Sequence, residues 1–90
     1  MGPMSEPDDW NNVAALPILE VLDRAGIAVS AGAIQLELER VMRRPPSRST
    51  ITRALKELQE AGLITKPDPE SIYYELTEEG VQYVSEYGDP

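Results

Sequence analysis

The chain has 90 residues, of which 16 are acidic and 8 basic, so its formal net charge at pH 7 is −8. One domain is expected at this length, and an apolar content of 41% is typical of a folded protein. Cysteine and histidine are absent, which removes disulfides, thiolate and imidazole metal sites and the commonest catalytic groups. We therefore expect neither an enzyme nor a cofactor, with a carboxylate-only metal site as the remaining alternative.

No apolar run approaches the roughly 20 residues of a membrane span and no signal peptide opens the chain, so a cytoplasmic protein without membrane contact is expected.

The N-terminal part divides into an acidic lead-in and a first helix. Residues 1–12 are expected to be flexible, and residues 1–3 resemble a cloning remnant before the second methionine. The folded domain is expected over residues 13–88. Apolar residues at helical spacing predict a first helix that stops at Gly26. Residues 27–29 then predict a short strand or an extended link.

Two further helices begin at serine residues that can cap them. Ser30 is predicted to cap a second helix, whose apolar stripe comprises Ile34, Leu38 and Val41. Pro45 and Pro46 cannot continue that helix. Ser47 is predicted to cap a third helix over residues 48–61, whose buried stripe comprises Ile51, Ala54, Leu55 and Leu58.

After the third helix the periodicity changes from helical to alternating. Residues 63–66 and 72–76 predict a β-hairpin, and one face of its second strand comprises Ile72, Tyr74 and Leu76. Thr77 is predicted to cap a last helix, which Gly80 weakens in its first turn. The residues of this helix that are predicted to point inward are Val81 and Val84.

The order α-(β)-α-α-β-β-α predicts a small α+β fold of the winged helix-turn-helix type, in which the third helix is presented to DNA. Residues 40–56 contain six basic residues and no acidic one, a charge of +6. The other two basic residues and all 16 acidic residues give the rest of the chain −14, and the two parts sum to −8. Because a DNA duplex carries one negative charge per about 1.7 Å, this segregation predicts binding of double-stranded DNA, with helix 48–61 in the major groove.

Burial of the apolar stripe directs one set of side chains of the third helix outward: Arg48, Ser49, Thr52, Arg53 and Lys56. Arg48 and Arg53 are predicted to read base edges. The helix start at Ser47 suits a phosphate, because the first amides of a helix are free. Arg43 and Arg44, in the preceding turn, are predicted to contact phosphates, and Lys66 is the candidate contact from the hairpin.

Two alternative interpretations of the basic residues remain open. The outward face can be an ordinary solvated face that pairs with neighbouring acids, namely Arg53 with Glu57, Lys56 with Glu60 and Arg40 with Glu37. The fold can also serve as a protein–protein interaction module of a larger transcription or replication assembly, because winged helices are not restricted to DNA.

A homodimer is predicted because a domain of this size has little surface with which to read DNA alone, and two half-sites double the contacts. The residues near the chain ends that are predicted to form its interface are Trp10, Tyr83, Val84 and Tyr87.

The segment SRSTITRALKELQEAGLITKPDPESIYYELTEEGVQYV, which begins at Ser47, resembles winged-helix transcriptional regulators of halophilic archaea. It is most similar to the phage phiH repressor family, which is related to the MarR and PadR groups, and the likeness covers about residues 16–87. The resemblance implies a regulator, acting as a repressor, that is often dimeric and reads the major groove with its third helix. It also implies a protein adapted to molar salt, which accounts for the acid excess. The chain departs from the family at Pro17 in the first helix and at the acidic hairpin tip around Asp68, which puts hairpin contacts with DNA in doubt.

Overall fold

The computed structural model describes residues 14–88, so the predicted flexible segment 1–12 and Trp10 lie outside the described residues. The elements follow the predicted order: α1 (Ala15–Ala25), β1 (Val29–Ser30), α2 (Ala31–Val41), α3 (Arg48–Glu60), β2 (Ile64–Thr65), β3 (Tyr73–Leu76) and α4 (Glu78–Tyr87). The protein is therefore a small α+β fold with four helices and three strands in the described part.

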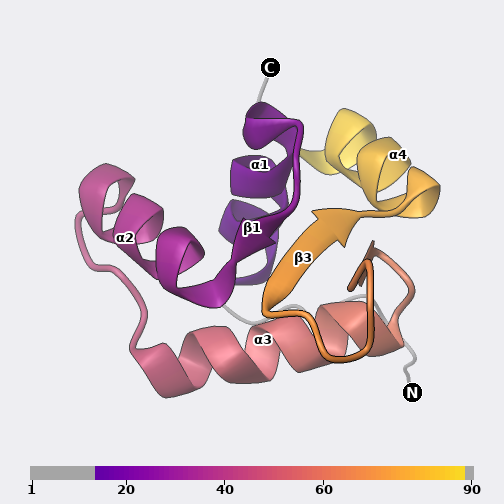
Figure 1. Cartoon of the computed structure of the whole chain (residues 1–90). Helices are drawn as coiled ribbons and strands as arrows, with labels where there is room; N and C mark the ends of the chain where they lie inside the picture. Colours follow the sequence, from indigo (N-terminus) through magenta and orange to yellow (C-terminus); the bar gives the residue numbers. More distant parts are fainter. Residues whose placement is uncertain (1–13, 89–90) are drawn as a thin grey trace, which may run out of the picture.

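The three strands form one antiparallel sheet in the order β1-β3-β2. Val29 pairs with Tyr74 on one side of β3, and Ile64 pairs with Leu76 on the other. Figure 1 shows α3 along one side of the protein and α4 on the opposite side, with the sheet between them. The central helix is α1, which contacts α2, α3, α4 and β3.

The core is built from the apolar stripes of the helices and from β2. Its largest fully buried side chains are Ile18, Leu19, Ile34, Leu38, Ile51, Leu58 and Ile64. No polar or charged residue is buried within residues 14–88. The hydrophobic effect therefore holds this core together without buried ion pairs.

Each of the three predicted helix caps is confirmed. Ser30 Oγ accepts a hydrogen bond from the amide of Ala33 at 3.1 Å, and Ser47 Oγ accepts one from Thr50 at 3.2 Å. Thr77 Oγ1 accepts one from Gly80 at 3.0 Å. Each such bond satisfies an amide that lacks a partner in the helix, and a cap contributes about 1 kcal/mol.

The predicted helix stop at Gly26 is also confirmed, because Gly26 has φ of 69° and its amide donates to the carbonyl oxygen of Leu22. A left-handed conformation of this kind favours glycine. Pro17 is the third residue of α1, within the first turn, where it removes no helical hydrogen bond.

Three apolar residues that were predicted to lie on inward or shared faces are exposed instead. Val41 is the last residue of α2 and is 48% exposed, because the chain leaves the core there. Ile72 is 65% exposed and precedes β3, which begins only at Tyr73. Val84 is buried as predicted, but Val81 is 50% exposed because the other buried residue of α4 is Gly80, one position before it.

Gly80 has a packing role that its helix propensity does not reveal. A Cβ atom at this position would overlap the backbone carbonyl oxygen of Leu63. The same approach lets Thr77 donate from its amide to Leu63 at 3.0 Å and from its hydroxyl to Gly62 at 2.7 Å. The first turn of α4 is thus fixed directly on the segment between α3 and β2.

Candidate nucleic-acid interface

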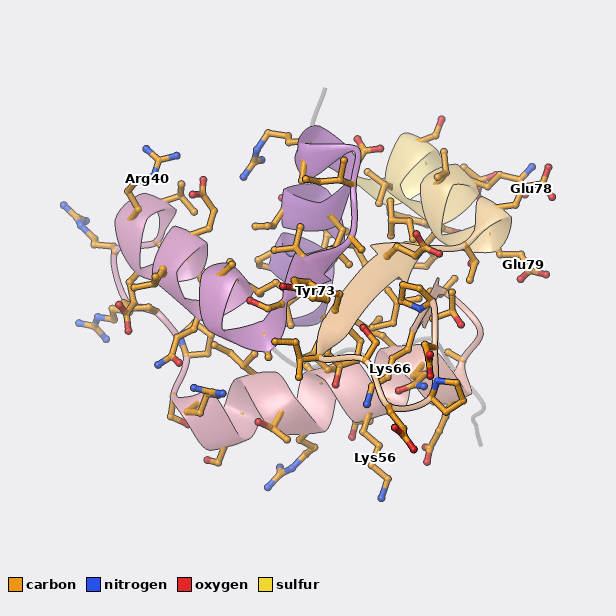
Figure 2. The ribbon with its side chains drawn as sticks, in the orientation of Figure 1. Arg40, Lys56, Lys66, Tyr73, Glu78 and Glu79 are labelled. Atoms are coloured by element: carbon orange, nitrogen blue, oxygen red, sulfur yellow. The ribbon has the colours of Figure 1, made fainter. Side chains whose placement is uncertain are left out.

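The two faces of α3 differ sharply in character. The buried face comprises Ile51, Ala54, Leu55 and Leu58, as predicted. The exposed face includes all five residues that were predicted to point outward: Arg48, Ser49, Thr52, Arg53 and Lys56. Figure 2 shows Lys56 extending from α3 away from the body of the protein. Arg48 and Lys56 are eight residues apart, so the exposed polar stripe is about 12 Å long.

The start of α3 is organised by Ser47. Its hydroxyl oxygen accepts from the amide of Thr50 and lies 3.1 Å from Ser49 Oγ and 3.0 Å from Thr50 Oγ1. The hydroxyl of Ser47, which is a predicted DNA-contact residue, is therefore engaged in the cap. Within residues 14–88, the amides of Arg48 and Ser49 have no hydrogen-bond acceptor, so they remain free at the positive end of the helix.

Arg48 is attached to the neighbouring helix. Its Nη1 donates a hydrogen bond of 3.0 Å to Oε1 of Gln35 on α2. This contact fixes part of the guanidinium group and leaves its other N–H groups for a ligand. Sequence spacing gives no indication of Gln35, because the two residues are 13 positions apart and belong to different helices.

The predicted pairing of cations with neighbouring acids occurs only at Arg40. Its Nη2 lies 2.6 Å from Oε2 of Glu37, and the hydrogen bond from Arg40 holds the pKa of Glu37 below its ordinary value. Figure 2 shows Arg40 at the end of α2 that points away from α3. In the described part of the chain, Arg53 and Lys56 form no ion pair with an acid within 4.0 Å.

The turn before α3 adds two further cations. Arg43 and Arg44 lie in the connection of residues 42–47, and both side chains are exposed. Neither makes an ion pair or a side-chain hydrogen bond to another residue between positions 14 and 88. Together with Arg53 and Lys56, they form a set of four cations, on α3 and in the turn before it, that have no ion-pair partner in the described part of the chain. We call this set the basic face.

The β2–β3 hairpin has a mixed character. Lys66 Nζ lies 5.3 Å from the ring centroid of Tyr74, a cation–π arrangement. The loop is shaped by Asp68, whose carboxylate accepts from the amide of Glu70 and whose carbonyl accepts from Ser71. In Figure 2, Lys66 and Lys56 point toward the side of the protein opposite Glu78 and Glu79 on α4. The hairpin therefore offers one cation beside an acidic tip.

The chemical capability of this surface is recognition of an anionic polymer. The exposed stripe of α3 has guanidinium, ammonium and hydroxyl donors, and one helix fits the major groove, which is about 12 Å wide. Between residues 14 and 88 there is no cluster of three acidic side chains suited to a metal ion. No helix in this range combines the length and apolar character that crossing a membrane requires.

The sequence matches no protein-family model, and no curated protein or solved structure shows significant similarity to it. The assignment of a function therefore depends on the residues of the basic face and on their surroundings.

Proposed function

We propose that the protein is a winged-helix transcriptional regulator, acting as a repressor, that binds double-stranded DNA in a sequence-specific manner and places α3 in the major groove. The observation that carries this proposal is the basic face: four exposed cations that have no acidic partner within residues 14–88, in a chain of net charge −8. Unpaired cations that repel one another without a compensating contact are best explained by a polyanionic ligand.

The contacts divide by position. Arg53 lies in the second turn of the exposed stripe and is the best-placed base reader, because its guanidinium group is free to bind the two acceptors of guanine. Arg48, held in part by Gln35, presents its remaining donors from a fixed position. Arg43 and Arg44 neutralise phosphates and set the register of the protein on the duplex. Lys66 is the only basic contact that the hairpin supplies.

The acid excess bears on how the affinity is divided between contacts. In molar salt the Debye length falls to about 3 Å. Each phosphate that the protein neutralises adds about −0.9 to the slope of log affinity against log salt concentration, so affinity from phosphate contacts falls as salt rises. Phosphate contacts then contribute little, so base contacts from α3 must supply most of the affinity. The proposal of a halophilic source therefore assigns greater weight to Arg53 than to Arg43.

We propose a homodimer with a smaller interface than the sequence pattern indicated. Val84 is only 9% exposed and Tyr83 packs against the core, so Val84 is already used within the protomer. Tyr87 is 59% exposed and its ring centroid lies 4.6 Å from that of Tyr83. Of the residues predicted to form the interface, Tyr87 is therefore the one that a second copy can cover, and Trp10 lies outside the described residues.

The proposal is tested by selecting duplexes from a randomised pool at 0.2 M and at 1 M KCl and by titrating the enriched sequence by fluorescence anisotropy. We expect one motif to be enriched and to be bound more tightly than random duplex at both salt concentrations. The control is Arg40→Ala, because Arg40 is paired with Glu37 and lies away from α3.

The competing proposal is a protein-interaction module, which the acidic hairpin tip favours because Asp68 and Glu70 would repel a phosphate backbone. Absence of an enriched motif together with no duplex binding at either salt concentration would reject DNA binding and leave this second proposal.

A further inference from the structure

The end of the molecule opposite α3 contains a hollow of about 180 Å³, which is lined by four apolar side chains, two carboxylates and Gly26. Its lining residues come from the C-terminal end of α1 and the residues after it, from the end of β3 and from the first turn of α4. Leu22, which is 2% exposed, forms its floor with Leu76, while Ile27 is 71% exposed and Val81 is 50% exposed. A partner that covers Ile27 and Val81 would remove their exposed apolar surface from water, which favours binding.

The charges around this hollow all have one sign. Asp23 and Glu75 line it, and an adjoining hollow on the other side of Val81 is lined by Glu78 and Glu79. No lysine or arginine is among the residues that line either hollow. The nearest cation along α1, Arg24, instead lines a separate hollow with Glu37. We call the two hollows around Val81 the acidic groove.

We propose that the acidic groove binds a segment of another protein that presents one or two apolar side chains flanked by lysine or arginine. The apolar side chains would cover Ile27 and Val81, and the cations would face the four carboxylates. A second copy of this chain is disfavoured as the occupant, because each copy has a net charge of −8 and presents its unpaired cations on the basic face. The groove and the basic face lie at opposite ends of the fold, so both can be occupied at once.

A short fluorescein-labelled amphipathic peptide of leucine and lysine serves as the probe, with a scrambled peptide of the same composition as its control. Ile27→Ser is expected to weaken binding about tenfold, because the substitution removes most of the apolar surface that the peptide buries. The matched control is Leu36→Ser on α2, because Leu36 is 69% exposed but does not line the groove. A double variant, Asp23→Asn with Glu75→Gln, is expected to weaken binding and to flatten its salt dependence.

Both serine substitutions are at exposed positions, and thermal unfolding establishes that each variant is folded. Amide NMR spectra with the peptide are expected to show the largest shifts at residues 26–28 and 75–82, with DNA affinity unchanged. The proposal is overturned if the peptide does not bind, if the scrambled peptide binds equally well, or if Ile27→Ser and Leu36→Ser have the same effect. It is also overturned if sedimentation shows that Ile27→Ser converts a dimer to a monomer, because the occupant would then be a second copy.

Discussion

Replacing Gly80 with alanine is expected to destabilise the protein, although the same change in an open helix is stabilising. Alanine is favoured over glycine by about 1 kcal/mol in the interior of a helix. At position 80, however, the new Cβ atom would overlap the carbonyl oxygen of Leu63 and approach Leu76 Cδ2 at 3.0 Å. The backbone oxygen cannot move aside by a rotamer change, so the start of α4 must shift away from the segment between α3 and β2.

The magnitude follows from the contacts that this shift would disturb. Thr77 donates two hydrogen bonds across the junction, one to Gly62 and one to Leu63, each worth about 1 kcal/mol. Overpacking adds about 1–3 kcal/mol. After subtraction of the propensity gain, Gly80→Ala should lower the free energy of unfolding by about 2–4 kcal/mol. For a domain of this size the midpoint of thermal unfolding should fall by at least about 10 °C.

The assay is thermal unfolding followed by far-ultraviolet circular dichroism, with Gly32→Ala as the matched control. Gly32 lies in the first turn of α2, and a Cβ atom there has no neighbour within 4 Å. We expect this control to be neutral or more stable by up to about 1 kcal/mol. If Gly80→Ala is as stable as Gly32→Ala, the close approach of α4 to Leu63 does not exist in solution and the reasoning is refuted.

Three further predictions concern the basic face and its surroundings. In anisotropy titrations, Arg53→Ala should weaken binding to the selected duplex by about 1–3 kcal/mol and reduce the difference in affinity between this duplex and random duplex. Arg43→Ala should weaken binding to all duplexes alike and reduce the slope of log affinity against log salt concentration by about one unit. Equal behaviour of the two variants would contradict the assigned roles. Ser47→Ala should lower the free energy of unfolding by about 1 kcal/mol in urea titrations, because Thr50 loses its acceptor, and an unchanged midpoint would mean that the cap is not formed. The carboxyl group of Glu37 should titrate by NMR below its ordinary pKa and move back toward it in Arg40→Ala. Because the folded-state pKa is the lower one, this small stabilisation is present above the pKa of the unfolded state and is lost as the pH falls through the folded value.

Prediction from the sequence succeeded where the cause of a feature lies within one or two helical turns. The caps at Ser30, Ser47 and Thr77 satisfy amides three residues away, and the helix stop at Gly26 needs only one left-handed residue. The apolar stripe of α3 follows from helical spacing alone, and its burial fixes which side chains face outward.

The predictions that failed concern residues whose environment is set by another element. Val81 is exposed because the closest approach of α4 to the rest of the fold occurs at Gly80, and that approach depends on the position of Leu63. Ile72 fits the alternation of a strand, yet β3 begins one residue later, after a loop that Asp68 shapes through hydrogen bonds. Helical or alternating spacing cannot anticipate either case.

For the six basic residues between positions 40 and 56, the sequence by itself determined which residues are present, that two of them lie in the turn before a helix, and that no acidic residue lies among them. Only the tertiary structure decided which of these cations have partners. Arg40 is paired with Glu37 of the same helix, one of the three pairs that sequence spacing allowed. Arg48 is held by Gln35 of another helix, 13 residues away, and Arg53 and Lys56 leave the acids next to them in α3 unpaired. The physical reason is that charge is a property of each residue, whereas its compensation depends on side-chain geometry and on distances between elements that are set when the core packs.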